Sequence, residues 1–310
     1  MKNYTIAIHG GAGTLLKQHM TTEKETAYKQ ALSIALDQGT AILENGGTAV
    51  DAVAAAVRNM EDSPLFNAGK GSVFTAQGTH EMDAAIMDGK DLNAGAVSLI
   101  TGIKNPIDLA RDVMEHSEHV FLAGDGAMEF ANSRGYQTEK PEYFFDQLRY
   151  DQWQEIKDSE RFQLDHSVNK DSKFGTVGAV AMDQQGNIAA ATSTGGMTNK
   201  KWGRIGDSPM IGAGNYANNH TCAVSCTGSG EFFIRGVVAY EVSALMEFKG
   251  LSLEQAAHEV IQNRVKKIGG DGGLIAVDVQ GNITMPFNTA GMYRAFAKAN
   301  SPKTIAIYKD

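Results

Sequence analysis

Two threonines that a predicted β-hairpin would bring together are the first candidates for chemistry in this sequence. Residues 174–183 form a run of small and β-branched residues, a turn signal follows at 184–187, and a second apolar run spans 188–194. Two such runs around a glycine-containing turn predict a hairpin. With the turn centred in that signal, Thr176 lies opposite Thr194, and directly opposed Cβ atoms are about 4.5–5.5 Å apart. The hairpin therefore predicts two hydroxyl groups side by side at its open end.

A base is needed before either hydroxyl can act, because a threonine hydroxyl alone is a weak nucleophile. The sequence places no histidine near Thr176. A chain cut before Thr176 would supply the base itself, since an α-amine has a pKa of about 7.7–8.0 and is partly neutral at working pH. Gly175 suits such a cut because glycine adopts backbone angles closed to other residues. The alternative is that Gly175 and Thr176 form an ordinary strand entrance.

Composition limits the class of protein. The chain has 310 residues, of which 42% are hydrophobic, enough for one large core or two tightly joined layers. Its 34 glycines against 6 prolines favour tight turns and close backbone contacts, as in a β-rich or α/β enzyme. A net charge of −8 argues against nucleic acid or an anionic membrane as a partner.

The cysteines and the absence of certain motifs predict a compartment. Cys222 and Cys226 share one face of a predicted strand about 13 Å apart, too far for a disulfide, so we expect buried thiols in a reducing environment. The sequence contains no CxxC or HExxH motif, which argues against a zinc site. It also shows no signal-peptide pattern and no run of 18 apolar residues. These features predict a cytoplasmic protein without a membrane span.

A glycine-rich segment, HGGAG at 9–13, follows the first predicted strand at 4–8. It lacks the lysine of a phosphate-binding P-loop and the spacing of a dinucleotide fingerprint. It is similar to the oxyanion loop of α/β-hydrolases, but the chain has no GxSxG elbow. We therefore interpret it as a buried turn that requires glycine.

The remaining elements predict a layered α+β architecture. Helices are expected at 22–44, 49–60, 106–116, 126–133, 230–248 and 253–268, and strands at 80–87, 94–99, 119–122, 221–226, 273–279, 282–285, 292–297 and 304–308. Many of these strands are apolar on both faces, which indicates sheets covered on both sides by other layers. Residues 137–173 are polar and irregular, and 156–175 are expected to form a flexible linker, either a processing arm or a domain linker.

Eight segments in order resemble the isoaspartyl peptidase/L-asparaginases, the plant-type asparaginases of the N-terminal-nucleophile hydrolase superfamily. Each segment alone is weak, but together they cover nearly the whole chain. The segments are 9–13 (HGGAG), 66–69 (FNAG), 82–88 (MDAAIMD), 175–180 (GTVGAV), 191–199 (ATSTGGMTN), 203–209 (GRIGDSP), 226–231 (CTGSGE) and 286–289 (PFNT).

This resemblance implies a fold and a processing event. The implied fold is a four-layer αββα sandwich formed by residues 1–310 as a single domain. The implied event is autoproteolysis between Gly175 and Thr176, which would give an α subunit of residues 1–175 and a β subunit of residues 176–310. The family also implies an (αβ)2 dimer that acts on asparagine and β-aspartyl dipeptides.

The resemblance assigns catalytic roles by position. Thr176 would be the nucleophile and its α-amine the base, while Thr194 would orient the amine or the hydroxyl. The hydroxyl of Thr227 and the backbone N–H of Gly228 would form the oxyanion hole, at a predicted helix N-terminus. Asn67 would support Thr176. An acyl-enzyme ester at Thr176 would then be hydrolysed by water.

The resemblance also assigns substrate-binding roles. Arg204 would hold the substrate α-carboxylate, which its planar fork suits. Asp207 would bind the α-ammonium, Gly230 would provide backbone contacts, and Thr227 and Gly228 would contact the carbonyl oxygen.

No organic cofactor is implied, but a structural sodium ion is. The backbone carbonyls that would hold it are those of Glu61, Ser63, Phe66, Ala68 and Lys70. Two positions depart from the family pattern: Lys70 is charged where relatives usually carry an uncharged residue, and Asn215 stands where cysteine or a small residue is usual.

Three alternatives remain at this point. A glycosylasparaginase is the nearest, although its nucleophile typically follows aspartate and here follows Gly175. A threonine endopeptidase usually carries longer insertions than 310 residues allow. A non-catalytic small-molecule binder that uses the 9–13 segment would stay uncut and would tolerate Thr176→Ala.

Overall fold

The computed structural model describes residues 3–13, 15, 17–158 and 175–309. Of the expected linker at 156–175, residues 159–174 lie outside this described part. Both cysteines are buried free thiols on one strand, as predicted. Within the described residues, no helix combines the length and apolarity that crossing a membrane requires.

Two sheets form the centre of the molecule. Eight strands make the larger sheet, in the order β12-β11-β1-β5-β6-β2-β3-β4, and four make the smaller, in the order β10-β9-β8-β7. Of the paired strands described, β3 and β4 run parallel and the other pairs are antiparallel. The strands of the larger sheet are β1 (Thr5–Gly13), β2 (Met82–Asp88), β3 (Ala94–Ile100), β4 (Phe121–Ala123), β5 (Val177–Met182), β6 (Ile188–Thr194), β11 (Gly291–Lys298) and β12 (Thr304–Tyr308). Those of the smaller sheet are β7 (Asn215–Ala217), β8 (Cys222–Gly228), β9 (Gly272–Asp278) and β10 (Ile283–Thr284).

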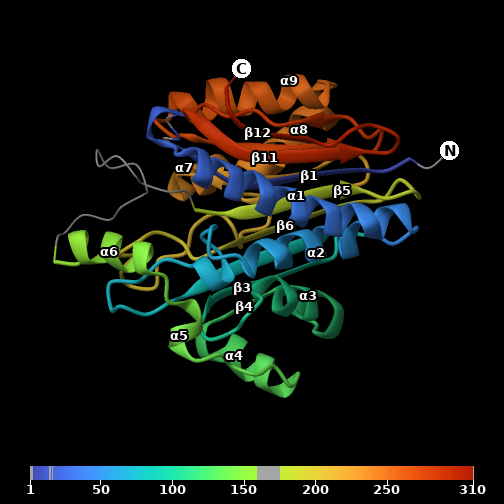
Figure 1. Ribbon diagram of the computed structural model, residues 1–310. Coiled ribbons are helices and arrows are strands. Elements are labelled where there is room, and N and C mark those ends of the chain that lie inside the picture. Colours follow the sequence, from blue (N-terminus) through green and yellow to red (C-terminus); the bar gives the residue numbers. More distant parts are fainter. Residues whose placement is uncertain (1–2, 14, 16, 159–174, 310) are drawn as a thin grey trace.

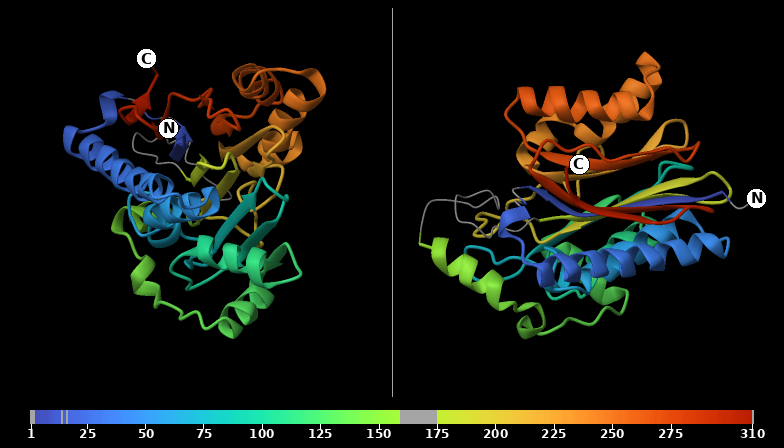
Figure 2. Two further views of the ribbon diagram at one scale, coloured as in Figure 1. Left: turned by 90° about the vertical axis from the view of Figure 1, so that its right-hand side faces the viewer. Right: turned by 45° about the horizontal axis from the view of Figure 1, so that its top comes forward.

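Helices cover the outer faces of both sheets (Figures 1 and 2). On the larger sheet lie α1 (Thr22–Glu44), α2 (Ala49–Glu61), α3 (Pro106–His116) and α4 (Gly124–Ser133). On the smaller sheet lie α7 (Gly230–Gly236), α8 (Val238–Lys249) and α9 (Leu253–His258), and α9 continues as a π-helical segment, Glu259–Val265. The short α5 (Pro141–Phe144), α6 (Gln147–Ile156) and 3-10 turns at Lys17–His19 and Gly69–Gly71 complete the described helices.

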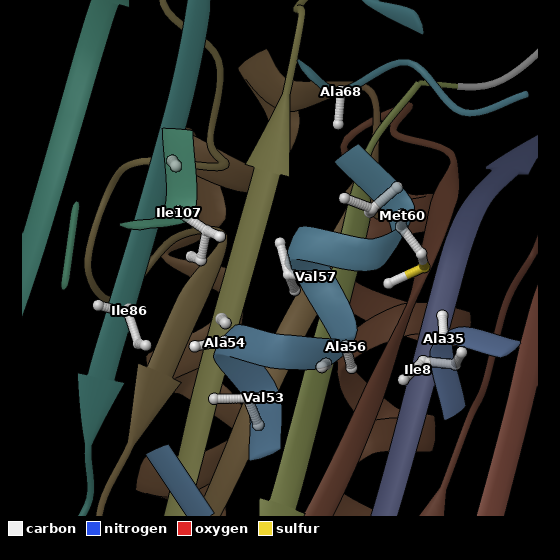
Figure 3. Close-up of a cluster of buried hydrophobic side chains, with 14 of the residues drawn as sticks. Ile8, Ala35, Val53, Ala54, Ala56, Val57, Met60, Ala68, Ile86 and Ile107 are labelled. Carbon is white, nitrogen blue, oxygen red and sulfur yellow. The ribbon is translucent and has the colours of Figure 1, made fainter. Parts of the chain in front are cut away.

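Three apolar clusters hold these layers together. The first joins α1, α2 and α3 to the larger sheet, the second joins α8 and α9 to the smaller sheet, and the third lies between the two sheets. Figure 3 shows the first of these around α2, where Val53 and Val57 lie over the strands beside Ile86. The expected four-layer αββα sandwich is therefore the observed architecture.

Three local expectations were wrong. Residues 9–13 continue β1 rather than turning, with a bulge between His9 and Gly11. Glycine suits this strand because a neighbouring side chain packs directly against its backbone: a Cβ atom on Gly10 would lie 2.4 Å from Cε1 of Phe66. The helix expected at 230–248 is two helices, broken at Val237, whose φ is +47°. Finally, α5 and α6 lie in the segment expected to be irregular, and Ile156 is the last residue of α6.

Candidate active site

The predicted hairpin of β5 and β6 brings the two threonines together. Val177 pairs with Ser193, so the next pair outward is Thr176 and Thr194, as the sequence predicted. The Thr176 hydroxyl, almost fully buried, donates to the hydroxyl of Thr194 across 3.3 Å. Ser208 lies on the other side, with its Oγ 3.4 Å from Thr176 Oγ1. The nucleophile expected from the sequence is therefore held between two hydroxyl groups.

The carbonyl of Gly175 lies within this cluster of polar groups. Thr194 Oγ1 donates to that carbonyl oxygen at 2.6 Å, and Nδ2 of Asn67 approaches it at 3.4 Å. Asn67 is fixed in turn, because its Nδ2 donates to the carbonyl of Gly196 at 2.7 Å and its Oδ1 accepts the N–H of Val73 at 3.0 Å. Two donors thus converge on the peptide bond that precedes Thr176.

The residues expected to form an oxyanion hole lie at the end of β8, in the smaller sheet. Thr227 is buried, and its Oγ1 accepts the backbone N–H of Ala12 from β1 at 3.3 Å. Gly228 has φ of +152°, and a Cβ atom there would lie 2.4 Å from the carbonyl oxygen of Asp271. Both residues belong to β8, and α7 begins only at Gly230, so the strand rather than a helix terminus positions them.

Arg204, Asp207 and Gly230 form a second cluster with opposite charges. A Cβ atom on Gly230 would lie 2.9 Å from Nη2 of Arg204 and 2.9 Å from Oδ1 of Asp207, so both side chains pack directly against this glycine. Asp207 is buried, and its Oδ2 has no hydrogen-bond partner among the described residues. Burial raises the pKa of Asp207 to about 6, although the charge of Arg204 opposes this shift. A buried carboxylate with an open oxygen is suited to bind a cation.

Two residues of the site were not anticipated from the sequence. Ser208 was passed over within the 203–209 segment, although it follows Asp207 directly. Glu231 accepts hydrogen bonds from Nε and Nη2 of Arg204 at 2.8 and 2.9 Å. This fork-to-fork ion pair fixes the plane of the guanidinium group. A signal existed for Glu231, because an acidic residue in the first turn of a helix is a common partner for a nearby arginine, but its partner depends on the fold.

The loop between α2 and the Gly69–Gly71 turn offers backbone oxygens at close quarters. A Cβ atom on Gly71 would lie 2.1 Å from the carbonyl oxygen of Phe66, and one on Gly69 would lie 2.5 Å from that of Glu61. Backbone carbonyl oxygens of this kind are ligands that a hard cation such as sodium accepts. Lys70 places its Nζ 5.3 Å from the ring centroid of Tyr143, in contact with that ring.

Comparisons with known proteins identify the family of this chain. The model of the asparaginase family matches residues 2–307. The isoaspartyl peptidase of Escherichia coli K12 is 50% identical over 313 aligned residues, which cover all of this chain and 98% of that protein. The probable isoaspartyl peptidase/L-asparaginase 2 of Arabidopsis thaliana is 41% identical over the full length of both chains, and the isoaspartyl peptidase/L-asparaginase of Mus musculus is 41% identical over 94% of this chain and 87% of its own. The chain therefore belongs to the asparaginase family and is a hydrolase.

Proposed function

We propose that this protein cuts itself before Thr176 and then hydrolyses the amide of asparagine and the isopeptide bond of β-aspartyl dipeptides through an ester on Thr176. The observation that carries the proposal is the hydrogen-bond relay from the Thr176 hydroxyl to Thr194 and from Thr194 to the Gly175 carbonyl. The relay puts a nucleophile beside the peptide bond that it would attack and polarises that bond.

Self-cleavage follows from this arrangement in two balanced steps. Thr176 Oγ adds to the carbonyl carbon of Gly175, the hydroxyl proton passes to the peptide nitrogen, and the C–N bond breaks as a C–O ester bond forms. Thr194 and Asn67 donate to the carbonyl oxygen that becomes negative in this step. Water then hydrolyses the ester, which leaves a carboxylate on Gly175 and a free amine on Thr176.

Turnover would use the same hydroxyl with the new amine as its base. The amine takes the Thr176 proton, Oγ attacks the substrate carbonyl, and the amine returns the proton to the departing ammonia or amino acid. Thr227 and the N–H of Gly228 would stabilise the oxyanion. Water activated by the same amine then releases aspartate.

The charged cluster accounts for the proposed substrates. Asparagine and β-aspartyl dipeptides share an α-carboxylate and an α-ammonium group and differ only in the leaving group. Arg204 would bind the carboxylate, Asp207 the ammonium through its unpartnered Oδ2, and Gly230 the same groups through its backbone. Relatives are named isoaspartyl peptidase and L-asparaginase, which supports both substrates.

A bound sodium ion and an (αβ)2 assembly belong to the same proposal. The carbonyls of the Glu61–Lys70 loop would hold the ion, which would stiffen the loop that carries Asn67. Sedimentation of the native protein measures the assembly, and thermal unfolding with sodium exchanged for a large organic cation measures the ion's contribution. The catalytic proposal depends neither on the sodium ion nor on the assembly.

The decisive experiment is the intact mass of the purified protein under denaturing conditions. We expect two species, residues 1–175 and 176–310, and a single uncut species for Thr176→Ala. The processed protein is then assayed with asparagine, a β-aspartyl dipeptide and an N-glycosylated asparagine, and we expect turnover of the first two. Preference for the glycosylated substrate would establish the glycosylasparaginase alternative, and a wild-type chain that stays whole and inactive would support the binder.

A further inference from the structure

A layer of four polar side chains lies between the two sheets, one step deeper than the candidate catalytic threonines. His9 of β1 and Thr192 of β6 belong to the larger sheet, and Asn215 of β7 and Ser225 of β8 to the smaller. None of the four has any measurable exposure to solvent. Burying polar groups costs free energy unless they are hydrogen-bonded, so such a layer requires a reason.

A single chain of hydrogen bonds joins these four residues. Asn215 Nδ2 donates to Thr192 Oγ1 at 3.1 Å. The hydroxyls of Thr192 and Ser225 are 2.7 Å apart, and Ser225 Oγ is 3.0 Å from Nε2 of His9. Every one of these bonds connects one sheet to the other. Asn215 can only donate through Nδ2, so Thr192 Oγ1 accepts from it, and the Thr192 hydroxyl also lies within hydrogen-bond distance, 3.3 Å, of the carbonyl oxygen of Gly214.

The layer lies directly beneath the candidate active site on the same strands. Thr192 is two residues before Thr194, Ser225 is two before Thr227, and residues two apart share a face of a strand. On β5, Gly178 is two after Thr176, and a Cβ atom there would lie 2.0 Å from Ser225 Oγ and 2.4 Å from His9 Nε2. The two side chains therefore occupy the space that a larger residue at 178 would fill.

His9, at one end of the layer, is a fully buried imidazole. Its Nε2 faces Ser225, and its Nδ1 has no hydrogen-bond partner among the described residues. Burial lowers the pKa of His9 to about 3, so the ring is neutral at working pH and Nε2 can accept a hydrogen bond. His9 therefore does not act as an imidazolium acid.

The next level down is apolar. It consists of side chains from both sheets that pack without polar contacts: Ala7, Val180, Ala190 and Ala223. One step deeper, the sheets therefore meet mainly through apolar packing, although the N–H of Ala217 also bonds to Sδ of Met87 at 3.2 Å. The connected chain of side-chain hydrogen bonds lies beside the candidate catalytic groups of the two sheets. Apolar contacts tolerate sliding between sheets, whereas hydrogen bonds fix both distance and direction.

We propose that His9, Thr192, Ser225 and Asn215 are positioning residues that hold the sheet of the nucleophile in register with the sheet of the oxyanion-binding residue. The inference rests on the proposed function, because it assumes that Thr176 and Thr227 act on one carbonyl group. Loss of a central bond in the layer lets Thr227 move relative to Thr176, and small displacements of reacting groups are costly in rate.

The test compares Thr192→Val, Thr192→Ser and Ser225→Ala with a control. Thr192→Val keeps the shape but removes the hydroxyl, and Thr192→Ser restores it. The control is Thr221→Val, because Thr221 is buried at the other end of β8 and its hydroxyl bonds to Ser243 at 2.6 Å. For each protein we measure the fraction cut over time, kcat, KM and the melting temperature.

We expect Thr192→Val and Ser225→Ala to lower kcat by about tenfold or more with KM changed by less than about threefold, because Arg204 and Asp207, which would bind the charged groups of the substrate, are untouched. Thr192→Ser should stay within about threefold of wild type. A double variant with both Thr192→Val and Ser225→Ala should lose less kcat than the product of the two single losses, because each single substitution already breaks the bond between these two residues. The control should lose stability without losing kcat.

Two outcomes separate this inference from the proposed function. An active, self-cut wild type whose Thr192→Val and Ser225→Ala variants keep wild-type kcat would overturn the positioning role alone. The same holds if these variants only melt earlier, as the control does. A wild-type chain that neither cuts itself nor hydrolyses either substrate would overturn the proposed function, and the positioning role with it. If Thr192→Val does not fold, Ser225→Ala gives the result.

Discussion

A single hydroxyl, that of Thr194, connects the proposed nucleophile, Thr176, to the peptide bond before it. It accepts the hydrogen bond of Thr176 and donates to the Gly175 carbonyl at 2.6 Å. We expect Thr194→Val to slow self-cleavage by about 100-fold, the usual loss when one donor to a developing oxyanion is removed. Thr194→Ser should restore most of the rate. Mass spectrometry of the freshly purified chains over several days measures the cut fraction, and equal rates for Val and wild type would contradict the relay.

If Asp207 binds the substrate ammonium, as proposed, substrate binding is sensitive to acid. Burial raises the pKa of its carboxyl from 3.8 to about 6, so below that pH the group is neutral in the free protein. A neutral carboxyl does not pair with the substrate ammonium. We therefore expect KM for asparagine to rise as pH falls from 7 to 5, and the pH profile of kcat/KM shows it. A KM that stays constant over this range would argue against Asp207 as the ammonium site.

The same carboxyl should reduce the stability of the fold at neutral pH. An acid whose pKa is raised by folding holds its proton more tightly in the folded state, so stability falls as pH rises through about 6. Asp207→Asn removes this loss, and the free energy of unfolding at pH 8 should rise by up to about 3 kcal/mol. At pH 4 the gain should be small. Urea unfolding at both pH values measures the difference. A variant whose stability does not rise at pH 8 would show that the buried Asp207 carboxylate does not destabilise the fold.

The residues of the site differ in how far the sequence could predict them. Thr176 and Thr194 could be paired because one short turn fixes the register of a hairpin. Ser208 carried no signal of its own, and Glu231 was signalled only as an acidic residue in the first turn of a helix, because the fold alone brings Arg204 close to it. His9 was assigned to a glycine turn, although its role in the structure depends on Ser225 of the other sheet.

At the level of elements, local patterns predicted most helices and strands but not their breaks. Helix α3 runs from Pro106 to His116 as predicted, because proline at its start is a local signal. The glycines of β1 were assigned to a loop, because the close contact with Phe66 that requires them is a tertiary one. The break between α7 and α8 was missed for the same reason: the N–H groups of Ala239 and Tyr240 bond to the carbonyls of a distant loop.

That break predicts a stabilising substitution. Val237 adopts φ of +47°, a conformation that is costly for a β-branched residue, and the residue is 46% exposed. We expect Val237→Gly to raise the free energy of unfolding by about 1 kcal/mol, because the strain relieved exceeds the added entropy of the unfolded chain. Ile234→Gly, in the regular part of α7, should lower stability. Thermal unfolding of both variants measures this, and a loss in both would mean that position 237 is not strained.

At the scale of the whole molecule, the proposed cut falls inside an interleaved sheet. Residues 1–175 contribute β1 to β4, and residues 176–310 contribute β5, β6, β11 and β12. In the sheet order, β1 of the first piece lies between β11 and β5 of the second, and β6 of the second pairs with β2 of the first. Groups of strands from the two pieces therefore follow one another across the sheet. Neither piece can complete the larger sheet without the other.

We therefore expect the cut protein to remain one particle. The two pieces should elute together in native size-exclusion chromatography and separate only in denaturant, because parting them would expose backbone groups along three strand pairings and much of the first apolar cluster. Residues 1–175 expressed alone should be insoluble or unfolded, and co-expression with residues 176–310 should rescue them. The Thr176→Ala chain, which we expect to stay whole, is the control for elution volume. Pieces that separate without denaturant would show that the larger sheet does not hold them together.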